Sequence, residues 1–314
     1  MSGLVDRHPG KTGMTLIELV VVLALLAGLA TMTLTGVADL GNRGRYDETS
    51  ARLRLIRQAV AGDGIEAGRF VRDMGRLPLV QGGGAGQALA ELWRDGGGVG
   101  YGPATNAAAW PDSIAGLFPH GDVKLACGWN GPYLMVDDPA TAESFDGFGN
   151  PWGLAGSGIG DSVTNVVSFG SDGAVGGTGW DEQDRTLDLA GLLPATELAV
   201  TIKARAGTNA GESAWALVED AGGATNAAPY QLDRLVVAVF TPNVGAATRS
   251  LRRELREGVG ATASFAGLWP TDCLVYAYGT NSAAPLLVSG PEPERVALKP
   301  GRNSLTLYLR GPQP

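Results

Sequence analysis

Three aspartates in one glycine-rich stretch are the residues whose types and spacing best fit a chemical role. Asp172, Asp181 and Asp184 lie in a segment that also contains glycines 170, 173, 176, 177 and 179. Glycine permits tight backbone turns, and Ca2+ takes about six to eight oxygen ligands from carboxylates and carbonyls in flexible geometry. A folded loop of this composition suits a calcium site, although the same aspartates also suit Asx turns on a solvated loop.

The composition leaves little for covalent catalysis. The chain of 314 residues has two histidines, His8 and His120, and two cysteines, Cys127 and Cys273. After residue 190 the sequence lacks histidine and shows neither a nucleophile-elbow nor a phosphate-loop pattern. The formal net charge of −8 disfavours nucleic acid, because binding to phosphates needs clustered Lys and Arg. We therefore predict that the protein is not an enzyme and does not bind nucleic acid.

An apolar segment near the N-terminus predicts a membrane crossing. Residues Met14–Ala38 are almost all apolar, and as a helix they would extend about 37 Å, against a bilayer core of about 30 Å. Arg7 and Lys11 precede the segment, so the positive-inside rule places everything after Ala38 outside the cytoplasm. Glu18 is the exception within the segment. A carboxylate costs about 2.5–3.5 kcal/mol at the bilayer centre and usually has a function there.

The residues around Gly13 resemble a known processing signal. Lys11-Thr-Gly13 followed by Met14-Thr-Leu-Ile-Glu18-Leu is similar to the cleavage and methylation signal of type IV pilins and type II secretion pseudopilins. The resemblance implies that a prepilin peptidase cuts between Gly13 and Met14 and that the new amine of Met14 is methylated. It also implies that Glu18 is the filament-assembly glutamate, whose carboxylate pairs with the amine of Met14 on a neighbouring subunit. The alternative is a plain signal anchor with Glu18 near the headgroups.

Four later segments resemble the G-type major pseudopilin of type II secretion. They are residues 128–134, 146–153, 166–173 and 176–184, in the order and spacing of that family. The resemblance implies a structural Ca2+ held by Asp172, Asp181 and Asp184, with Asp172 matching most securely. Asn150 departs from the family, where Asp is common before Pro-Trp-Gly, and Asp181-Glu-Gln-Asp184 departs from its terminal pattern.

The elements that position these residues follow from periodicity. Leu53, Ile56 and Val60 recur at helical spacing within a predicted helix over 46–60, and Gly41 and Gly44 are expected to loosen the helix before it. One further helix is predicted over 86–94. Short strands are predicted at 166–169, 198–202, 235–240, 274–278, 295–298 and 305–309, and a helix is predicted over 248–257.

The predicted fold class is α+β. A long N-terminal transmembrane and spine helix packs on a small antiparallel sheet, as in the type IV pilin fold, and a mostly β, sandwich-like domain follows. The predicted division is a leader peptide at 1–13, the transmembrane and spine helix at 14–62, a pseudopilin head with the aspartate loop at 63–190, and the additional domain at 191–314. Cys127 and Cys273 are predicted to be buried free thiols, with a disulfide between the domains as the alternative.

The resemblance implies a structural subunit of the type II secretion pseudopilus, which polymerises through its N-terminal helix to drive protein export across the outer membrane. Its partners would be a prepilin peptidase, copies of itself and other pseudopilins, the inner-membrane secretion platform and the membrane. Its location would be the inner membrane, crossed once, with the C-terminal bulk in the periplasm. Two alternatives stay open: a type IV pilus subunit for adhesion or motility, and a membrane-anchored binding protein that does not polymerise. The ligand of residues 191–314 is not indicated.

Overall fold

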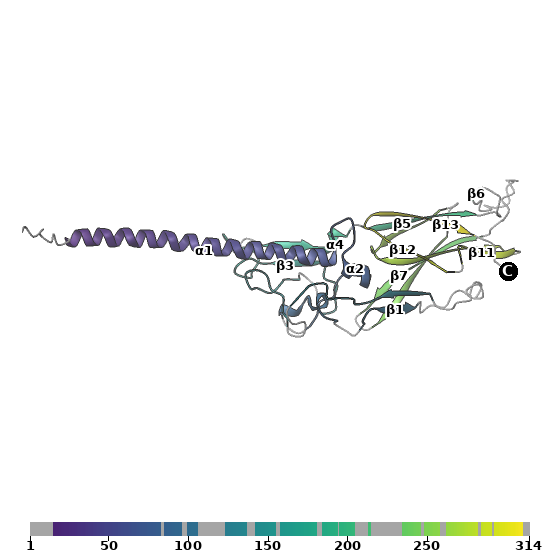
Figure 1. The fold of residues 1–314 in the computed structure, drawn as a ribbon, viewed down its shortest axis with the longest axis horizontal. Helices are drawn as coiled ribbons and strands as arrows, with labels where there is room; N and C mark the ends of the chain where they lie inside the picture. The colour runs from purple at the N-terminus through teal and green to yellow at the C-terminus, as the bar shows by residue number, and fades with distance from the viewer. Residues whose placement is uncertain are drawn as a thin grey trace, which may run out of the picture.

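One long helix projects from a body built mainly of strands (Figure 1). The structure is a computed structural model of the 314-residue chain. It describes residues 15–82, 85–95, 99–105, 123–136, 142–154, 158–180, 184–193, 195–204, 213–214, 234–245, 248–257, 262–281, 284–290 and 292–309. Gly13 and Met14, where cleavage and methylation are predicted, and Asp181 lie outside these residues.

The helix α1 runs without a break from Leu16 to Val60, 45 residues in all. It begins at Thr15, which caps its first turn, and ends at Ala61. Gly41 and Gly44 lie within it, so the two glycines do not end the helix. Among the described side chains of α1, the buried ones lie in its C-terminal part and include Leu53, Ile56 and Val60, as the helical spacing of these residues predicts.

The segment from Ala61 to Leu193, called the head below, contains short elements joined by long loops. These are α2 (Arg69–Met74), the 3-10 turns η1 (Ala85–Gln87) and η2 (Ala90–Leu92), β1 (Gly102–Thr105), β2 (Lys124–Cys127), β3 (Asn165–Ser168), β4 (Arg185–Asp188) and α4 (Leu189–Leu192). The helix predicted over 86–94 is wrong, because two separate 3-10 turns stand there. The predicted strand at 166–169 is confirmed as β3.

The described residues from Thr196 to Leu309 form two mostly antiparallel sheets, called the β-sandwich below. Its strands are β5 (Thr196–Ala204), β6 (Ser213–Ala214), β7 (Arg234–Val244), β8 (Arg249–Glu257), β9 (Thr262–Leu268), β10 (Asp272–Asn281), β11 (Ala284–Val288), β12 (Glu294–Ala297) and β13 (Arg302–Leu309). One sheet has five strands in the order β11-β10-β7-β8 with β12 also on β10; the other has four, β13-β5-β6 with β9 also on β5. The helix predicted over 248–257 is wrong: these residues form β8, which pairs antiparallel with β7 from Val236 to Val244.

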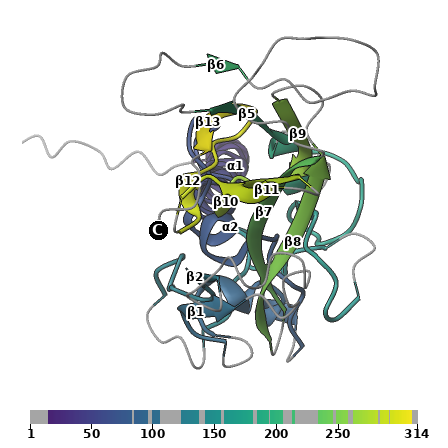
Figure 2. The same cartoon turned by 90° about the vertical axis from the view of Figure 1, so that its right-hand side faces the viewer.

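The central strands β7 and β10 of the five-stranded sheet are apolar on both faces. Leu235, Val237 and Val239 of β7 belong to a cluster with β5, β9 and β13. The intervening residues Val236 and Phe240 belong to the cluster that includes α1 and α2. Alternate residues of a strand point to opposite faces, so the sheet forms the middle of three layers (Figure 2).

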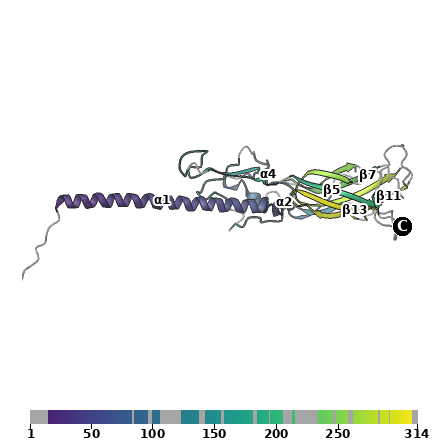
Figure 3. The ribbon, with the colours of Figure 1, turned by 90° about the horizontal axis from the view of Figure 1, so that it is seen from above.

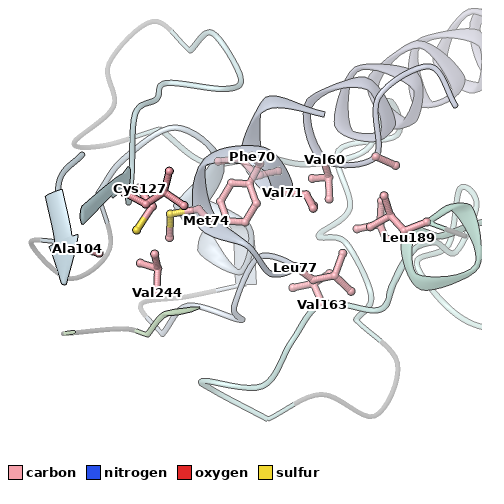
Figure 4. Close-up of a cluster of buried hydrophobic side chains, with 14 of the residues drawn as sticks. Val60, Phe70, Val71, Met74, Leu77, Ala104, Cys127, Val163, Leu189 and Val244 are labelled. Carbon is pink, nitrogen blue, oxygen red and sulfur yellow. The ribbon is translucent and has the colours of Figure 1, made fainter. Parts of the chain in front are cut away.

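The core of the head therefore continues onto the sheet. Figure 4 shows Val60 of α1, Phe70 and Met74 of α2, Leu189 of α4 and Val244 of β7 in one cluster. The close approach of α2 to β7 explains the glycine that ends α2. Gly75 has a φ of 68°, and a Cβ there would lie 2.6 Å from the carbonyl oxygen of Pro242.

The predicted fold class is corrected in its head. Instead of one small antiparallel sheet under the helix, the described head residues form two separate two-stranded ladders, β1–β2 and β3–β4. The apolar surface that such a sheet would supply comes from the five-stranded sheet, whose residues Val236, Ala238 and Phe240 share a cluster with Ile56. The chain thus does not form the predicted type IV pilin fold with a separate domain added. The physical reason is that β7 and β10 are apolar on both faces and must be covered on both.

The predicted transmembrane helix is also corrected. In the part of the chain that the structure describes, no helix is long and apolar enough to cross a membrane. A crossing helix needs about 20 consecutive apolar residues. The predictions of a membrane span and of a single-pass inner-membrane location with periplasmic bulk are therefore withdrawn.

Both cysteines are buried free thiols, as predicted. Cys127 packs in the cluster of the head and Cys273 in that of the β-sandwich. Burial raises the pKa of the Cys127 thiol to about 11 and that of the Cys273 thiol to about 12.

Candidate functional site

The start of α1 is closed by a reciprocal cap. The Glu18 backbone N–H donates to Thr15 Oγ1 at 3.3 Å, and the Thr15 backbone N–H donates to Glu18 Oε2 at 3.3 Å. This is a capping box, which satisfies two backbone donors at the helix start. Glu18 thus has a role within its own chain that the resemblance did not suggest, and the spacing Thr-x-x-Glu could have indicated it.

The described apolar side chains in the N-terminal half of α1 are exposed on every side of the helix. Their exposed fractions range from 40% for Val22 to 83% for Leu16. The set comprises Leu16, Ile17, Leu19, Val20, Val21, Val22, Leu23, Leu25, Leu26, Leu29, Met32, Val37 and Leu40. A contiguous apolar surface of this extent marks an interaction site. This half of the helix projects away from the body (Figure 1).

The aspartate loop lies between β3 and β4, beside α1 (Figure 3). Asp172 is exposed, and its Oδ1 accepts the Ala174 backbone N–H at 2.9 Å, which is an Asx turn. Asp184 Oδ2 accepts the Gly176 backbone N–H at 3.0 Å. Its other oxygen, Oδ1, is buried and has no hydrogen-bond donor among the described residues.

Asp184 fits a hard cation better than Asp172 does. A buried carboxylate oxygen without a hydrogen bond is costly, and a carboxylate oxygen is the ligand that Ca2+ prefers. Each aspartate accepts one backbone N–H with one of its oxygens. The other oxygen of Asp184 is buried, whereas Asp172 is exposed to solvent. Within the described residues, no three His, Cys, Asp or Glu side chains form a group that could hold a metal ion. The predicted third ligand, Asp181, lies outside those residues.

A buried aspartate that sequence reasoning missed organises the segment before the loop. Asp146 is 1% exposed. Its Oδ1 accepts the backbone N–H groups of Phe148 and Asn150 at 2.9 and 2.8 Å, and its Oδ2 accepts the Ser168 hydroxyl at 2.6 Å. Asn150 in turn donates from Nδ2 to the carbonyl oxygen of Gly170 at 2.9 Å. Asp146 therefore fixes β3 and the first residue of the aspartate loop.

The same segment is tied to α1. The Gly147 backbone N–H donates to Thr49 Oγ1 at 2.9 Å, and Arg52 donates to the Phe145 carbonyl oxygen at 2.6 Å. A Cβ on Gly147 would lie 2.0 Å from the carbonyl oxygen of Arg45, so only glycine allows this approach. The Asp146–Gly147 pair thus positions the loop against the helix.

The end of the loop also contacts α1. Trp180 Nε1–H donates to Asp39 Oδ1 at 2.7 Å, over a sequence separation of 141 residues. The Arg185 guanidinium donates to the Tyr46 hydroxyl and lies 4.9 Å from the centre of the Tyr46 ring. The centroids of the Tyr46 and Trp180 rings are 6.0 Å apart. We call these four side chains the α1 brace.

An open cavity of about 690 Å³ lies beside the C-terminal half of α1. Leu55, Ile56, Trp93 and Tyr133 are among its lining residues. Burial raises the pKa of the Tyr133 hydroxyl, and the neighbouring Asp73 carboxylate raises it further.

Comparisons with protein-family models, with curated proteins and with solved structures found no match to this chain. The candidate site consists of an exposed apolar helix with a capped start and a loop that contacts the middle of this helix.

Proposed function

We propose that this protein is a structural subunit of a type II secretion pseudopilus, that it assembles through α1 with copies of itself and with other pseudopilins, and that the filament drives protein export. The observation that carries the proposal is the exposed apolar half of α1, from Leu16 to Leu40. The resemblance of residues 11–19 to a prepilin processing signal supports it. The proposed role is mechanical, and no residue performs covalent catalysis.

The energetics favour helix packing between copies. Burying one leucine or valine side chain gains about 1.5–3 kcal/mol. The exposed apolar residues surround α1 on all sides, so one neighbouring helix cannot cover them. Several helices around each α1 can, and this is the arrangement of a filament with the helices at its centre.

The proposal assigns Glu18 a second role in the filament. Cleavage after Gly13 by a prepilin peptidase would leave a free amine on Met14, next to the helix start. When α1 is surrounded by other apolar helices, an unpaired carboxylate there is costly. Pairing Glu18 with the Met14 amine of a neighbouring copy removes that cost and sets the stagger between the two helices.

The proposal also includes a structural Ca2+ in the aspartate loop. Asp184 would hold it through its buried Oδ1, with Asp172 and Asp181 as further carboxylate ligands. The ion would supply positive charge that neutralises these carboxylates and orders the loop. The buried oxygen without a donor at Asp184 supports this assignment.

The proposed function is tested by deleting the gene and comparing the proteins that the mutant and its parent release. We expect secreted proteins to be retained in the cells, and a gene copy carrying Glu18→Gln to restore release poorly. Loss of attachment or twitching with normal protein release would instead indicate a pilus subunit. Normal release together with normal attachment would contradict assembly into either filament.

A further inference from the structure

We propose that Trp180 and Arg185 are positioning residues that hold the glycine-containing middle of α1 rigid and so set the direction of its exposed apolar half. The inference rests on the proposed function only in taking that half as the assembly surface. The brace itself is a property of the single chain and can be tested in the absence of assembly.

The middle of α1 is the part of the helix that most needs support. Gly41 and Gly44 lie three residues apart within it. Glycine in a helix interior destabilises the helix, because it has the largest conformational freedom to lose. A Cβ at either position would meet nothing within 4 Å. Close packing within the single chain therefore does not require these glycines, and their effect there is to make this part of the helix easier to open.

The α1 brace contacts the helix on both sides of the two glycines. Asp39 precedes them and accepts from Trp180, whereas Tyr46 follows them and accepts from Arg185. Asp39 and Tyr46 are about two helical turns apart and lie on the same face. The Tyr46 and Trp180 rings also lie 6.0 Å apart, which joins the two contacts into one. Opening the helix between Asp39 and Tyr46 would break this arrangement.

The brace is fastened to the buried core of the head. Arg185 is the first residue of β4 and pairs with Ser168 of β3. Ser168 donates to the buried Asp146, and its neighbour Val167 belongs to the buried residues. Thr49 and Arg52 already attach the C-terminal half of α1 to the head. The brace adds contacts at Asp39 and Tyr46, which lie closer to the apolar half.

Hydrogen exchange of the full chain, kept monomeric in mild detergent and followed by mass spectrometry, tests the inference. Trp180→Ala removes the hydrogen bond and the ring, whereas Trp180→Phe removes only the donor. We expect amide exchange in residues 39–47 to rise about two- to tenfold in Trp180→Phe, the loss of one hydrogen bond, and more in Trp180→Ala. Trp269→Ala, on the β-sandwich and 37% exposed, is the matched control and should leave residues 39–47 unchanged.

A rescue experiment separates the brace from general destabilisation. Adding Gly41→Ala and Gly44→Ala should lower helix opening by about two- to fivefold at each position, because both sites have room for a Cβ. We expect this pair to restore slow exchange to Trp180→Phe. Unchanged exchange in Trp180→Ala would overturn the inference. So would a rise of equal size in residues 52–60 that the alanines do not rescue, since it would show that Trp180 only stabilises the head.

Failure of the proposed function would look different. If the brace variants change amide exchange as expected but the wild-type chain forms no filaments, the brace is confirmed as a stabilising contact. Its proposed role in orienting an assembly surface is then wrong. If the wild type assembles and Trp180→Ala assembles equally well despite faster exchange, the helix direction is set by something other than the brace.

Discussion

Replacing Glu18 and Thr15 separately distinguishes the two roles that the structure and the sequence assign to the start of α1. Within the chain, Glu18 and Thr15 cap the helix through bonds of 3.3 Å in both directions. Glutamine preserves a capping box, so Glu18→Gln should leave the monomer almost unchanged. Thr15→Ala removes the cap and costs about 1 kcal/mol of helix stability, but it keeps the carboxylate.

In the filament, Glu18→Gln should have a larger effect than Thr15→Ala, the reverse of their effects on the monomer. Without the Glu18 charge, the Met14 amine of a neighbour would be buried unpaired, which costs about 3–5 kcal/mol. The concentration needed for assembly should then rise roughly a hundredfold or more. Thr15→Ala should raise it only about fivefold, the equivalent of its 1 kcal/mol.

The assay is sedimentation of filaments from purified, processed chain over a series of concentrations, with circular dichroism of the monomer. Intact-mass measurement of the N-terminus controls for altered cleavage after Gly13. Equal effects of the two substitutions, or wild-type assembly of Glu18→Gln, would refute charge pairing and leave Glu18 as a capping residue only.

Three further predictions concern the body of the protein. Asp184→Asn should weaken Ca2+ binding at least tenfold by calorimetry, because it removes the carboxylate whose buried oxygen has no donor. The control Asp161→Asn, on an exposed turn, should leave Ca2+ binding unchanged. Equal binding by both variants would exclude Asp184 as a ligand. Phe240→Ala should lower the free energy of unfolding by about 3–5 kcal/mol. Because β7 contributes to both apolar clusters, the head and the β-sandwich should still unfold in one transition. Two separate transitions would contradict the shared core. Burial raises the pKa values of Cys127 and Cys273 from 9.0 to about 11 and about 12. The folded state therefore keeps protons that the unfolded state loses, and stability should fall as the pH rises from about 9 to about 12. Thiol labelling at pH 8 should accordingly require unfolding, and rapid labelling of the native protein would contradict the burial of either thiol.

Elements with a clear periodicity could be predicted from the sequence. The alternation of Leu198, Val200 and Ile202 predicts β5, and all three residues are buried on one face of it. The helical spacing of Leu53, Ile56 and Val60 predicts the buried stripe of α1. In each case one face of one element carries the apolar residues, so the pattern is complete within a short window.

Residues 248–257 show where that reasoning fails. Their arginines, glutamates and leucines are good helix formers, yet they form β8. The pairing of β8 with β7 decides this, because an unpaired edge of β7 would leave backbone groups without hydrogen bonds. The same limit applies to the fold class: the second apolar face of β7 is visible as a run of apolar residues, but the run does not say what covers it.

For the candidate site, the sequence by itself determined the chemistry of the parts: the apolar start of α1, its single carboxylate at Glu18, and a glycine-rich loop with aspartates. These are properties of residue type and local spacing. Only the tertiary structure decided how the parts meet, namely that Asp146 fixes the loop and that Trp180 contacts Asp39 across 141 residues. Such contacts form because α1 and the aspartate loop are each attached to the core and so lie side by side. No local sequence pattern shows that two segments so far apart in the chain are neighbours in space.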